Sequence, residues 1–263
     1  MVNEKEKSQY PMLVLTGENS LINVVKSPVK LEILNLLGNR KMYFKDIVNE
    51  LGKAKSTISV HLKQLEKKEL IGSELDIYDN RKKMFFINSN ILAEIDFIKQ
   101  QDFDGERTEN FIKDVIENDP EKDFTRLVSH SVRSKLLENG ISLSPLIYET
   151  GVEVGKIIYK QVYSKTDEGL IKNLTKFWEK YKLGRLEVEE KEDALHIKNY
   201  ECFECEPLPK VDYPICYFEL GVIETILKNY YDTDIEIHEE LCMTMDSDHC
   251  LFIVKKIEDN TFF

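Results

Sequence analysis

The feature that most constrains this chain is a pair of short helical patterns followed by a hairpin pattern, all within residues 45–88. Apolar residues recur at helical spacing in Lys45–Leu51 and in Ser56–Leu65, and a short turn containing glycine separates the two segments. Alternating runs at Ser73–Tyr78 and Lys83–Asn88 then predict a β-hairpin with a basic, turn-prone tip. Two helices joined by a tight turn and followed by a basic hairpin predict a winged helix-turn-helix, in which one helix enters the major groove of duplex DNA.

The second helical pattern supplies most of the residues that we expect at DNA. Its apolar side, Ile58, Leu62 and Leu65, has the spacing of a buried helix face, so the opposite side faces outward. The expected DNA contacts are Lys55, Ser56, Thr57, Ser59, Val60, His61, Lys63 and Gln64 on this helix and Arg81 and Lys82 at the hairpin tip. Of these, Thr57, Val60, His61 and Gln64 would read bases, and Lys55, Lys63, Arg81 and Lys82 would contact phosphates. Taken alone, each basic residue is more typical of a solvated surface and His61 of a partly buried polar group, so only the combination favours DNA.

An upstream helix and the distribution of charge complete the expected DNA-binding domain, residues 17–90. Leu21–Leu37 has helical spacing, and Gly38 and Asn39 supply a stop. The net charge of −12 at first argues against a nucleic-acid partner. However, residues 17–90 hold 13 Lys and Arg against 9 Asp and Glu, so they carry about +4 and the chain from Ile91 onward about −16. The basic part can therefore contact DNA while the acidic remainder is held off it.

The length of 263 residues exceeds the usual size of one domain, so we expect more than one. After the winged helix-turn-helix we expect a helical linker at 91–120 and an α+β domain at 121–258. The start of the chain lacks a signal-peptide pattern and no segment is apolar enough to span a membrane, so we expect a cytoplasmic protein without a membrane partner. In that compartment the five cysteines favour metal ligands or redox thiols over a disulfide framework.

The linker contains two helical patterns, Asn90–Gln100 and Thr108–Glu117. These helices either connect the two domains or form the interface of a homodimer, because winged-helix readers usually bind two half-sites as symmetric pairs. The sequence leaves both interpretations open.

The C-terminal part mixes helical and alternating patterns and predicts an α+β domain. We expect helices at Phe124–Glu138, Ser144–Val162, Asp167–Lys182 and Tyr217–Tyr230, and strands at Arg185–Glu190, Ala194–Glu201, Asp234–Thr244 and His249–Ile257. Gly151 and Gly155 lie four residues apart on one of these helices, where the missing side chains would allow close packing of another element.

Four residues of this domain form a candidate metal site: Cys216, Glu239, Cys242 and Cys250. Cys216 stands at the start of a predicted helix, and the other three lie on a predicted terminal hairpin with Asp246 in its turn. Three thiolates and a carboxylate brought together in this way suit tetrahedral Zn²⁺. Isolated buried thiols are the alternative interpretation.

The run Ser-Thr-Ile-Ser-Val-His-Leu-Lys-Gln-Leu, residues 56–65, resembles the recognition helix of the ArsR-like winged-helix repressors, in which a small polar pair precedes His-Leu and a further Leu. This resemblance covers residues 20–90. It implies a DNA-binding domain of the winged helix-turn-helix type and a role in transcription.

The stretch from Tyr-Glu-Thr-Gly at residues 148–151 to Glu-x-x-Cys-x7-Cys at residues 239–250 is similar to a 4-vinyl-reductase-type sensor domain. In the phenol-sensing bacterial activators, domains of this kind hold structural zinc with three Cys and one Glu. The matching positions here are Cys216, Glu239, Cys242 and Cys250, so the resemblance implies one structural Zn²⁺ per chain. That family usually has Gly where this chain has Asp246, but Asp tolerates a left-handed turn better than most residues.

Joined in this order, the two domains resemble the redox regulators specific to methanogens, which are archaeal, over nearly the whole chain. That family often carries Cys-x2-Cys-x3-His. Here Cys202 and Cys205 supply the first part, but Pro209 stands in place of the His. The resemblance implies a redox role for Cys202 and Cys205, with an inert or metal-assisting pair as the alternative.

The sequence therefore predicts a repressor that binds operator DNA as a homodimer and responds to cysteine oxidation. A regulator that responds to a small molecule and has purely structural zinc is the alternative, and a reductase-type enzyme or a metal-stabilised assembly protein comes behind it. The chain has no Gly-rich phosphate loop and no Ser/His/Asp arrangement, so we expect no enzyme.

Overall fold

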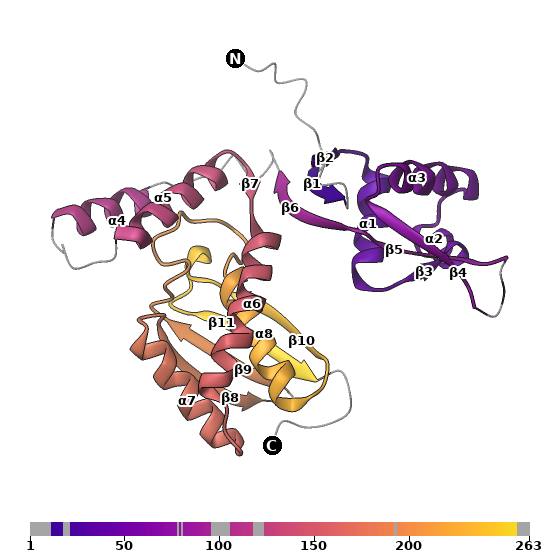
Figure 1. Cartoon of the computed structure of the whole chain (residues 1–263). Helices are drawn as coiled ribbons and strands as arrows, with labels where there is room; N and C mark the ends of the chain where they lie inside the picture. Colours follow the sequence, from indigo (N-terminus) through magenta and orange to yellow (C-terminus); the bar gives the residue numbers. More distant parts are fainter. Residues whose placement is uncertain are drawn as a thin grey trace, which may run out of the picture. The chain divides into compact units, whose positions relative to one another are not determined.

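The computed structural model describes residues 12–17, 22–77, 79, 81–95, 106–117, 124–191 and 194–256. The chain divides into two compact units (Figure 1). Among the described residues, the N-terminal unit comprises those up to Ile95 together with Gly140–Leu143, and the C-terminal unit comprises the rest. Both units combine helices with antiparallel sheets, as predicted for an α+β chain.

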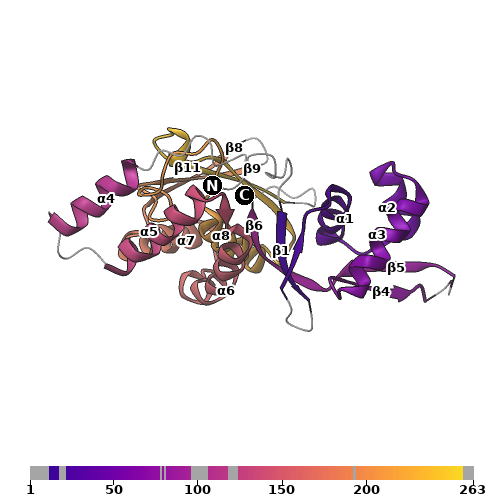
Figure 2. The ribbon, with the colours of Figure 1, turned by 90° about the horizontal axis from the view of Figure 1, so that it is seen from above.

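The N-terminal unit contains the three helices and the hairpin of a winged helix-turn-helix. These elements are α1 (Pro28–Asn39), β3 (Met42–Tyr43), α2 (Phe44–Leu51), α3 (Lys55–Lys67), β4 (Ile71–Leu75) and β5 (Lys83–Ile87). The strands form a sheet in the order β3-β5-β4. The helices bury Ile33, Ile47 and Ile58 completely in one shared core. Helix α2 ends as expected, because Gly52 takes a left-handed φ of 60° and donates its N–H to the carbonyl of Val48 at 3.0 Å. Figure 2 shows the β4–β5 hairpin beside α2 and α3.

A second sheet in this unit corrects the predicted helix Leu21–Leu37. The sheet has the order β2-β1-β6-β7 and is formed by β1 (Met12–Gly17), β2 (Ile22–Val25), β6 (Ser89–Ile95) and β7 (Ile141–Ser142). The first part of the predicted helix is therefore a strand, and the helix begins only at Pro28. The physical reason is the proline, because it disfavours helical backbone in the residue before it, and Ser27 is extended with φ −76° and ψ 121°.

The same sheet corrects the predicted helix Asn90–Gln100. Over its described part this segment is strand β6, which pairs with β1 so that Ile91 lies opposite Leu15 and Ala93 opposite Val14. Residues 96–100 lie outside the described residues. Helical spacing of the apolar residues misled the prediction, because the partner strand is distant in sequence and no local pattern shows it.

The C-terminal unit places helices against one face of an antiparallel sheet. Its elements are α4 (Glu106–Glu117), α5 (Phe124–Glu138), α6 (Ser144–Val162), α7 (Asp167–Lys180), β8 (Arg185–Lys191), β9 (Ala194–Tyr200), α8 (Tyr217–Tyr231), β10 (Ile235–Leu241), a 3-10 turn at Met243–Met245 and β11 (Cys250–Lys256). The sheet order is β10-β11-β9-β8. In Figure 2 the strands form one layer, and α6, α7 and α8 form another. The predicted elements from Phe124 onward are confirmed, with boundaries shifted by no more than a few residues.

Helices α6 and α8 lie side by side (Figure 1), and two glycines of α6 permit this approach. A Cβ on Gly151 would lie 2.2 Å from the carbonyl oxygen of Phe218, and one on Gly155 would lie 3.0 Å from that of Val222. The packing role predicted for this glycine pair is confirmed.

Helices α4 and α5 form a pair in the C-terminal unit (Figure 1). On α5, the large apolar side chains of Phe124, Val128 and Val132 are exposed at i, i+4 and i+8, so they form one stripe along the helix. No helix within the described residues is both long and apolar enough to cross a membrane.

Candidate metal centre and nucleic-acid interface

The C-terminal unit gathers all five cysteines into one place. Cys202 and Cys205 lie in the turn after β9, Cys216 occupies the N-cap position of α8, Cys242 follows β10 and Cys250 begins β11. All five are free thiols and are 0% exposed. We call these thiols together with the Glu239 carboxylate the cysteine cluster.

Three thiols of the cluster have the spacing of ligands around a single ion. The Sγ atoms of Cys216 and Cys242 are 3.8 Å apart, those of Cys216 and Cys250 3.6 Å, and those of Cys242 and Cys250 4.0 Å. A tetrahedral ion with Zn–S bonds of about 2.3 Å separates its sulfurs by about 3.8 Å. The three sulfurs therefore need little movement to bind zinc.

Glu239 provides the fourth ligand of this group. It lies on β10 at an irregularity in the pairing with β11, with its side chain buried. Its Oε2 accepts the N–H of Cys216 at 2.8 Å, while its Oε1 is buried without a hydrogen-bond partner among the described residues. Burial, with the charge of Cys242 as a further cause, raises the pKa of Glu239 to about 10. A carboxylate oxygen left without a partner beside three thiols fits a metal ligand, and the four ligand atoms lie within 4.8 Å of one another.

Cys202 and Cys205 are also part of this cluster, which corrects the prediction of a separate loop pair without structural duty. The Sγ of Cys202 lies 3.6 Å from that of Cys216, and the Sγ of Cys205 lies 3.3 Å from that of Cys250. These four sulfurs form a second group within 4.8 Å of one another. Sequence separation hid this proximity, because the turn folds back onto the α8 N-terminus. The redox role of the pair stays a prediction.

A buried carboxylate fixes this turn, and the sequence analysis did not assign it a role. Glu204 accepts the N–H groups of Phe218 and Glu219 at 3.1 and 2.9 Å, so it caps the N-terminus of α8. It also pairs with Arg133 at 3.0 Å. Burial raises the pKa of Glu204 to about 7, although the Arg133 charge opposes this shift. The turn that carries Cys202 and Cys205 is thus held in one conformation.

A second unforeseen carboxylate, Glu219, contacts the cluster from α8. Its Oε2 lies 3.4 Å from the Sγ of Cys202, and its Oε1 accepts hydrogen bonds from Trp178 at 2.8 Å and Asn199 at 2.7 Å. Burial raises the pKa of Glu219 well above its usual value. The available signal was a single acidic residue within a largely apolar helix, which is unusual unless the group has partners.

Helices α4 and α5 hold the same turn from the other side. Their side chains bind its carbonyl oxygens, and the pairs are His130 Nε2 with Phe203 at 2.9 Å, Arg107 Nη2 with Glu206 at 2.8 Å and Thr108 Oγ1 with Pro207 at 3.0 Å. A change at Cys202 or Cys205 would therefore alter how α4 and α5 are held.

In the N-terminal unit, α3 exposes most of the residues expected at DNA. Ile58, Leu62 and Leu65 are buried, as predicted. The exposed side carries Lys55, Ser56, Thr57, Val60, Lys63 and Gln64. Ser59 and His61 are only half-buried, and Nδ1 of His61 is buried without a hydrogen-bond partner among the described residues.

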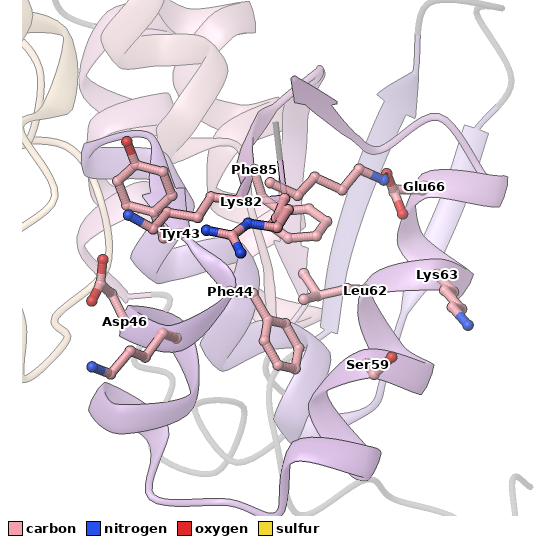
Figure 3. A pocket seen from close by; sticks show the side chains of 12 residues that line it. Tyr43, Phe44, Asp46, Ser59, Leu62, Lys63, Glu66, Lys82 and Phe85 are labelled. Carbon is pink, nitrogen blue, oxygen red and sulfur yellow. Dashed lines mark hydrogen bonds and ion pairs between the residues drawn. The ribbon is translucent and has the colours of Figure 1, made fainter. Parts of the chain in front are cut away.

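A groove of about 740 Å³ lies between α2, α3 and the hairpin (Figure 3). Its lining includes the cations Lys45, Lys63, Arg81, Lys82 and Lys83. Asp46 and Glu66 also line it, and Glu66 pairs with Lys83 at 2.7 Å. The sequence analysis missed Lys45 and Lys83, whose signal was their position beside the predicted turn and strand. The groove is predominantly basic, as a surface that approaches phosphates must be.

The hairpin tip holds its two basic residues beside an acidic one. Arg81 Nε lies 3.0 Å from Asp79 Oδ1, and Lys82 Nζ lies 3.7 Å from Asp79 Oδ2. The Arg81 side chain is 91% exposed, so water screens this pairing. Asp79 still reduces the positive charge that the tip offers to phosphate.

Two family models match separate parts of the chain. Residues 27–73 match the arsR family of bacterial regulatory proteins, and residues 195–256 match the vinyl-4-reductase domain. The first match covers α1 to α3, and the second covers the whole cysteine cluster together with β10 and β11. The arsR match points to a DNA-binding regulator rather than an enzyme.

Relatives come from the archaeon Methanocaldococcus jannaschii. The uncharacterized protein MJ1642 is 30% identical over 120 residues, which are 46% of this chain and 69% of that protein. The uncharacterized protein MJ0150 is 29% identical over 160 residues, which are 58% of this chain and 90% of that protein. The crystal structure of a vinyl-4-reductase family protein from the same organism aligns with a TM-score of 0.36 and 20% identity over 57% of this chain and 94% of that chain. This chain therefore belongs to the family of MJ1642, and it joins an ArsR-type helix-turn-helix to a vinyl-4-reductase domain.

Proposed function

We propose that this chain is a transcription repressor that binds operator DNA and releases it when the cysteine cluster changes state. The observation that carries the proposal is the exposed side of α3, where Thr57, Val60 and Gln64 stand beside a basic groove. A helix of this length with uncharged side chains outward and cations at its margins suits base reading in a major groove. The arsR match supports the same interpretation.

The proposed repressor holds structural Zn²⁺ at Cys216, Glu239, Cys242 and Cys250. Zinc has no redox chemistry, so its contribution is to tie the β10–β11 turn to the start of α8. The cluster geometry supports this assignment through its sulfur spacing and the unpartnered Glu239 oxygen.

The proposed repressor acts as a homodimer. Phe124, Val128 and Val132 on α5 form an exposed apolar stripe, and Ile116 on α4 is 64% exposed. Contiguous apolar surface of this kind is typical of protein interfaces. A second copy packed on it would supply the two-fold symmetry that pairs two α3 helices with two half-sites.

The proposed signal is oxidation of Cys202 and Cys205 by a small-molecule disulfide. The two thiols lose two protons and two electrons and form one S–S bond, while the oxidant disulfide is reduced to two thiols. The new bond would draw the pair away from Cys216 and Cys250 and move the turn that α4 and α5 hold. A tenfold change in DNA affinity needs a bias of only about 1.4 kcal/mol between two dimer geometries.

A mobility-shift assay with the DNA upstream of the protein's own gene tests this proposal. We expect binding by the protein in the presence of reductant and about tenfold weaker binding after treatment with oxidised glutathione. The double variant Cys202→Ser, Cys205→Ser should bind DNA and ignore the oxidant. Absence of binding in both states would contradict the DNA-binding function. A response retained in the double variant would move the sensor to the other three cysteines, and no response in the wild type would favour a small-molecule effector.

A further inference from the structure

The cysteine cluster contains more ligand atoms than one tetrahedral ion can use. Its five thiols and one carboxylate fall into two overlapping groups of four. One group is Cys216, Glu239, Cys242 and Cys250, and the other is Cys202, Cys205, Cys216 and Cys250. Cys216 and Cys250 belong to both.

We infer that the cluster is built to hold two divalent ions, the second bound by Cys202, Cys205, Cys216 and Cys250 with Cys216 and Cys250 as bridging thiolates. The inference rests on the first zinc site of the proposed function and adds a second position beside it. It does not depend on whether the chain binds DNA.

The number and spacing of the ligands carry this inference. Two tetrahedra that share one edge have six corners, which equals the number of ligand groups in the cluster. The shared edge, from Cys216 Sγ to Cys250 Sγ, is 3.6 Å long. From its two ends, Cys202 lies 3.6 Å from Cys216 and Cys205 lies 3.3 Å from Cys250. All of these lengths are close to the roughly 3.8 Å between sulfurs on one zinc ion.

The charge of the cluster permits the second ion. One divalent ion on three thiolates and a carboxylate leaves a formal charge of about −2. A second divalent ion adds two positive charges, and the neutral thiols of Cys202 and Cys205 become thiolates when they bind it, so the total stays at about −2. Cys216 also stands at the N-terminus of α8, where the helix dipole favours negative charge.

The surroundings hold the second set of ligands in place before any ion arrives. The turn carrying Cys202 and Cys205 is pinned by Glu204 at the α8 N-terminus and by side chains of α4 and α5. Glu219 lies 3.4 Å from Cys202 Sγ and is itself held by Trp178. Outer partners of this kind orient metal ligands and are typical of built sites.

The ligand chemistry indicates which ions bind. Four thiolates at the second position and three at the first select soft or borderline ions such as Zn²⁺ and Cd²⁺, and disfavour Mg²⁺ and Ca²⁺. A second ion and a Cys202–Cys205 disulfide use the same sulfurs, so each excludes the other. The second ion should therefore protect this pair from the oxidant.

Metal analysis of the full chain tests the inference. The protein is purified under reducing conditions, loaded with excess Zn²⁺ and treated with a weak chelator to remove surface ions. We expect two Zn²⁺ per chain by native mass spectrometry, and two resonances in cadmium NMR after exchange with Cd²⁺. The double variant Cys202→Ser, Cys205→Ser should hold one ion and show one resonance. The matched control Glu206→Gln changes the same turn without touching a ligand and should hold two.

One ion per wild-type chain at saturation would overturn the inference, and this result needs no variant to be folded. Two ions retained in the double variant would overturn it as well, because the second ion would then lie elsewhere. In contrast, a chain that holds two ions but fails to bind DNA would overturn the proposed repressor and leave the two-ion cluster intact.

Discussion

The two units place their reactive side chains in opposite environments. In the N-terminal unit, the candidate DNA-binding residues lie on the exposed side of α3 and around an open groove, where water solvates them until a partner arrives. In the C-terminal unit, the five thiols are 0% exposed and share a core with Trp178 and Phe252. Buried polar groups must be satisfied, whereas exposed ones need not be. Substitutions at the first set should therefore change binding alone, and substitutions at the second set should change folding too.

The largest effect expected from this contrast is that of Cys216→Ser, because Cys216 belongs to both ligand groups. Loss of a structural metal is among the few changes that cost more than about 4 kcal/mol of unfolding free energy. We expect the calorimetric transition of the C-terminal unit to fall or vanish, with loss of bound metal, while the N-terminal unit keeps its transition. Val60→Ala on α3 is the control, and it should move neither transition. Unchanged melting and metal content in Cys216→Ser would refute the structural role of the cluster.

The glycines of the two units differ in the same way. A Cβ on Gly151 in α6 would lie 2.2 Å from a backbone oxygen of α8, whereas a Cβ on Gly38 in α1 would meet no atom within 4 Å. Gly151→Ala should lower the free energy of unfolding by about 1–3 kcal/mol, because backbone cannot yield cheaply. Gly38→Ala should raise it by up to about 1 kcal/mol through helix propensity. Urea unfolding of the two variants decides the matter, and equal effects would contradict the close packing of α6 on α8.

At the DNA-binding surface the effect should appear in recognition and not in stability. We expect Gln64→Ala, on the exposed side of α3, to reduce the preference for operator over unrelated DNA by about 1–3 kcal/mol, because the alanine side chain cannot hydrogen-bond a base. Metal content and melting should not change. Asn35→Ala, an uncharged polar residue exposed on α1, serves as the matched control. Fluorescence anisotropy with both DNA sequences measures the effect, and equal weakening on both would assign Gln64 to phosphate binding.

The sequence predicted local features well and failed where distant segments meet. The bounds of α5 and α6 agree residue for residue, because each helix has its own period and end signals. Asp246 stands in the left-handed conformation, with φ 64°, that was expected where related domains have glycine. In contrast, the strand nature of Ile22–Val25 and Ser89–Ile95 depends on pairing with β1, which no local pattern reveals.

The cysteine cluster shows the same limit. The four residues Cys216, Glu239, Cys242 and Cys250 could be grouped from their predicted elements and from a family resemblance, and they do come together. Cys202 and Cys205 could not be placed beside them, because this depends on how the turn after β9 is capped onto α8 by Glu204. Hydrogen bonds between segments, unlike periodicity, leave no trace in a single sequence.

The smallest expected effect concerns the hairpin tip, where an acidic residue reduces the exposed positive charge. If Arg81 and Lys82 bind phosphates, replacing both by Gln should weaken binding to all sequences and flatten the salt dependence by up to about one unit for each phosphate that is no longer neutralised. Asp79→Asn should act in the opposite direction and strengthen binding a few-fold on any DNA, since it frees both cations. The turn should survive, because an Asn oxygen can still accept the backbone N–H of Arg81 at the observed 3.2 Å. Glu74→Gln removes one negative charge from the neighbouring strand, where Glu74 pairs with Lys41. If that control strengthens binding as much as Asp79→Asn, net charge explains the gain and the hairpin tip does not touch DNA.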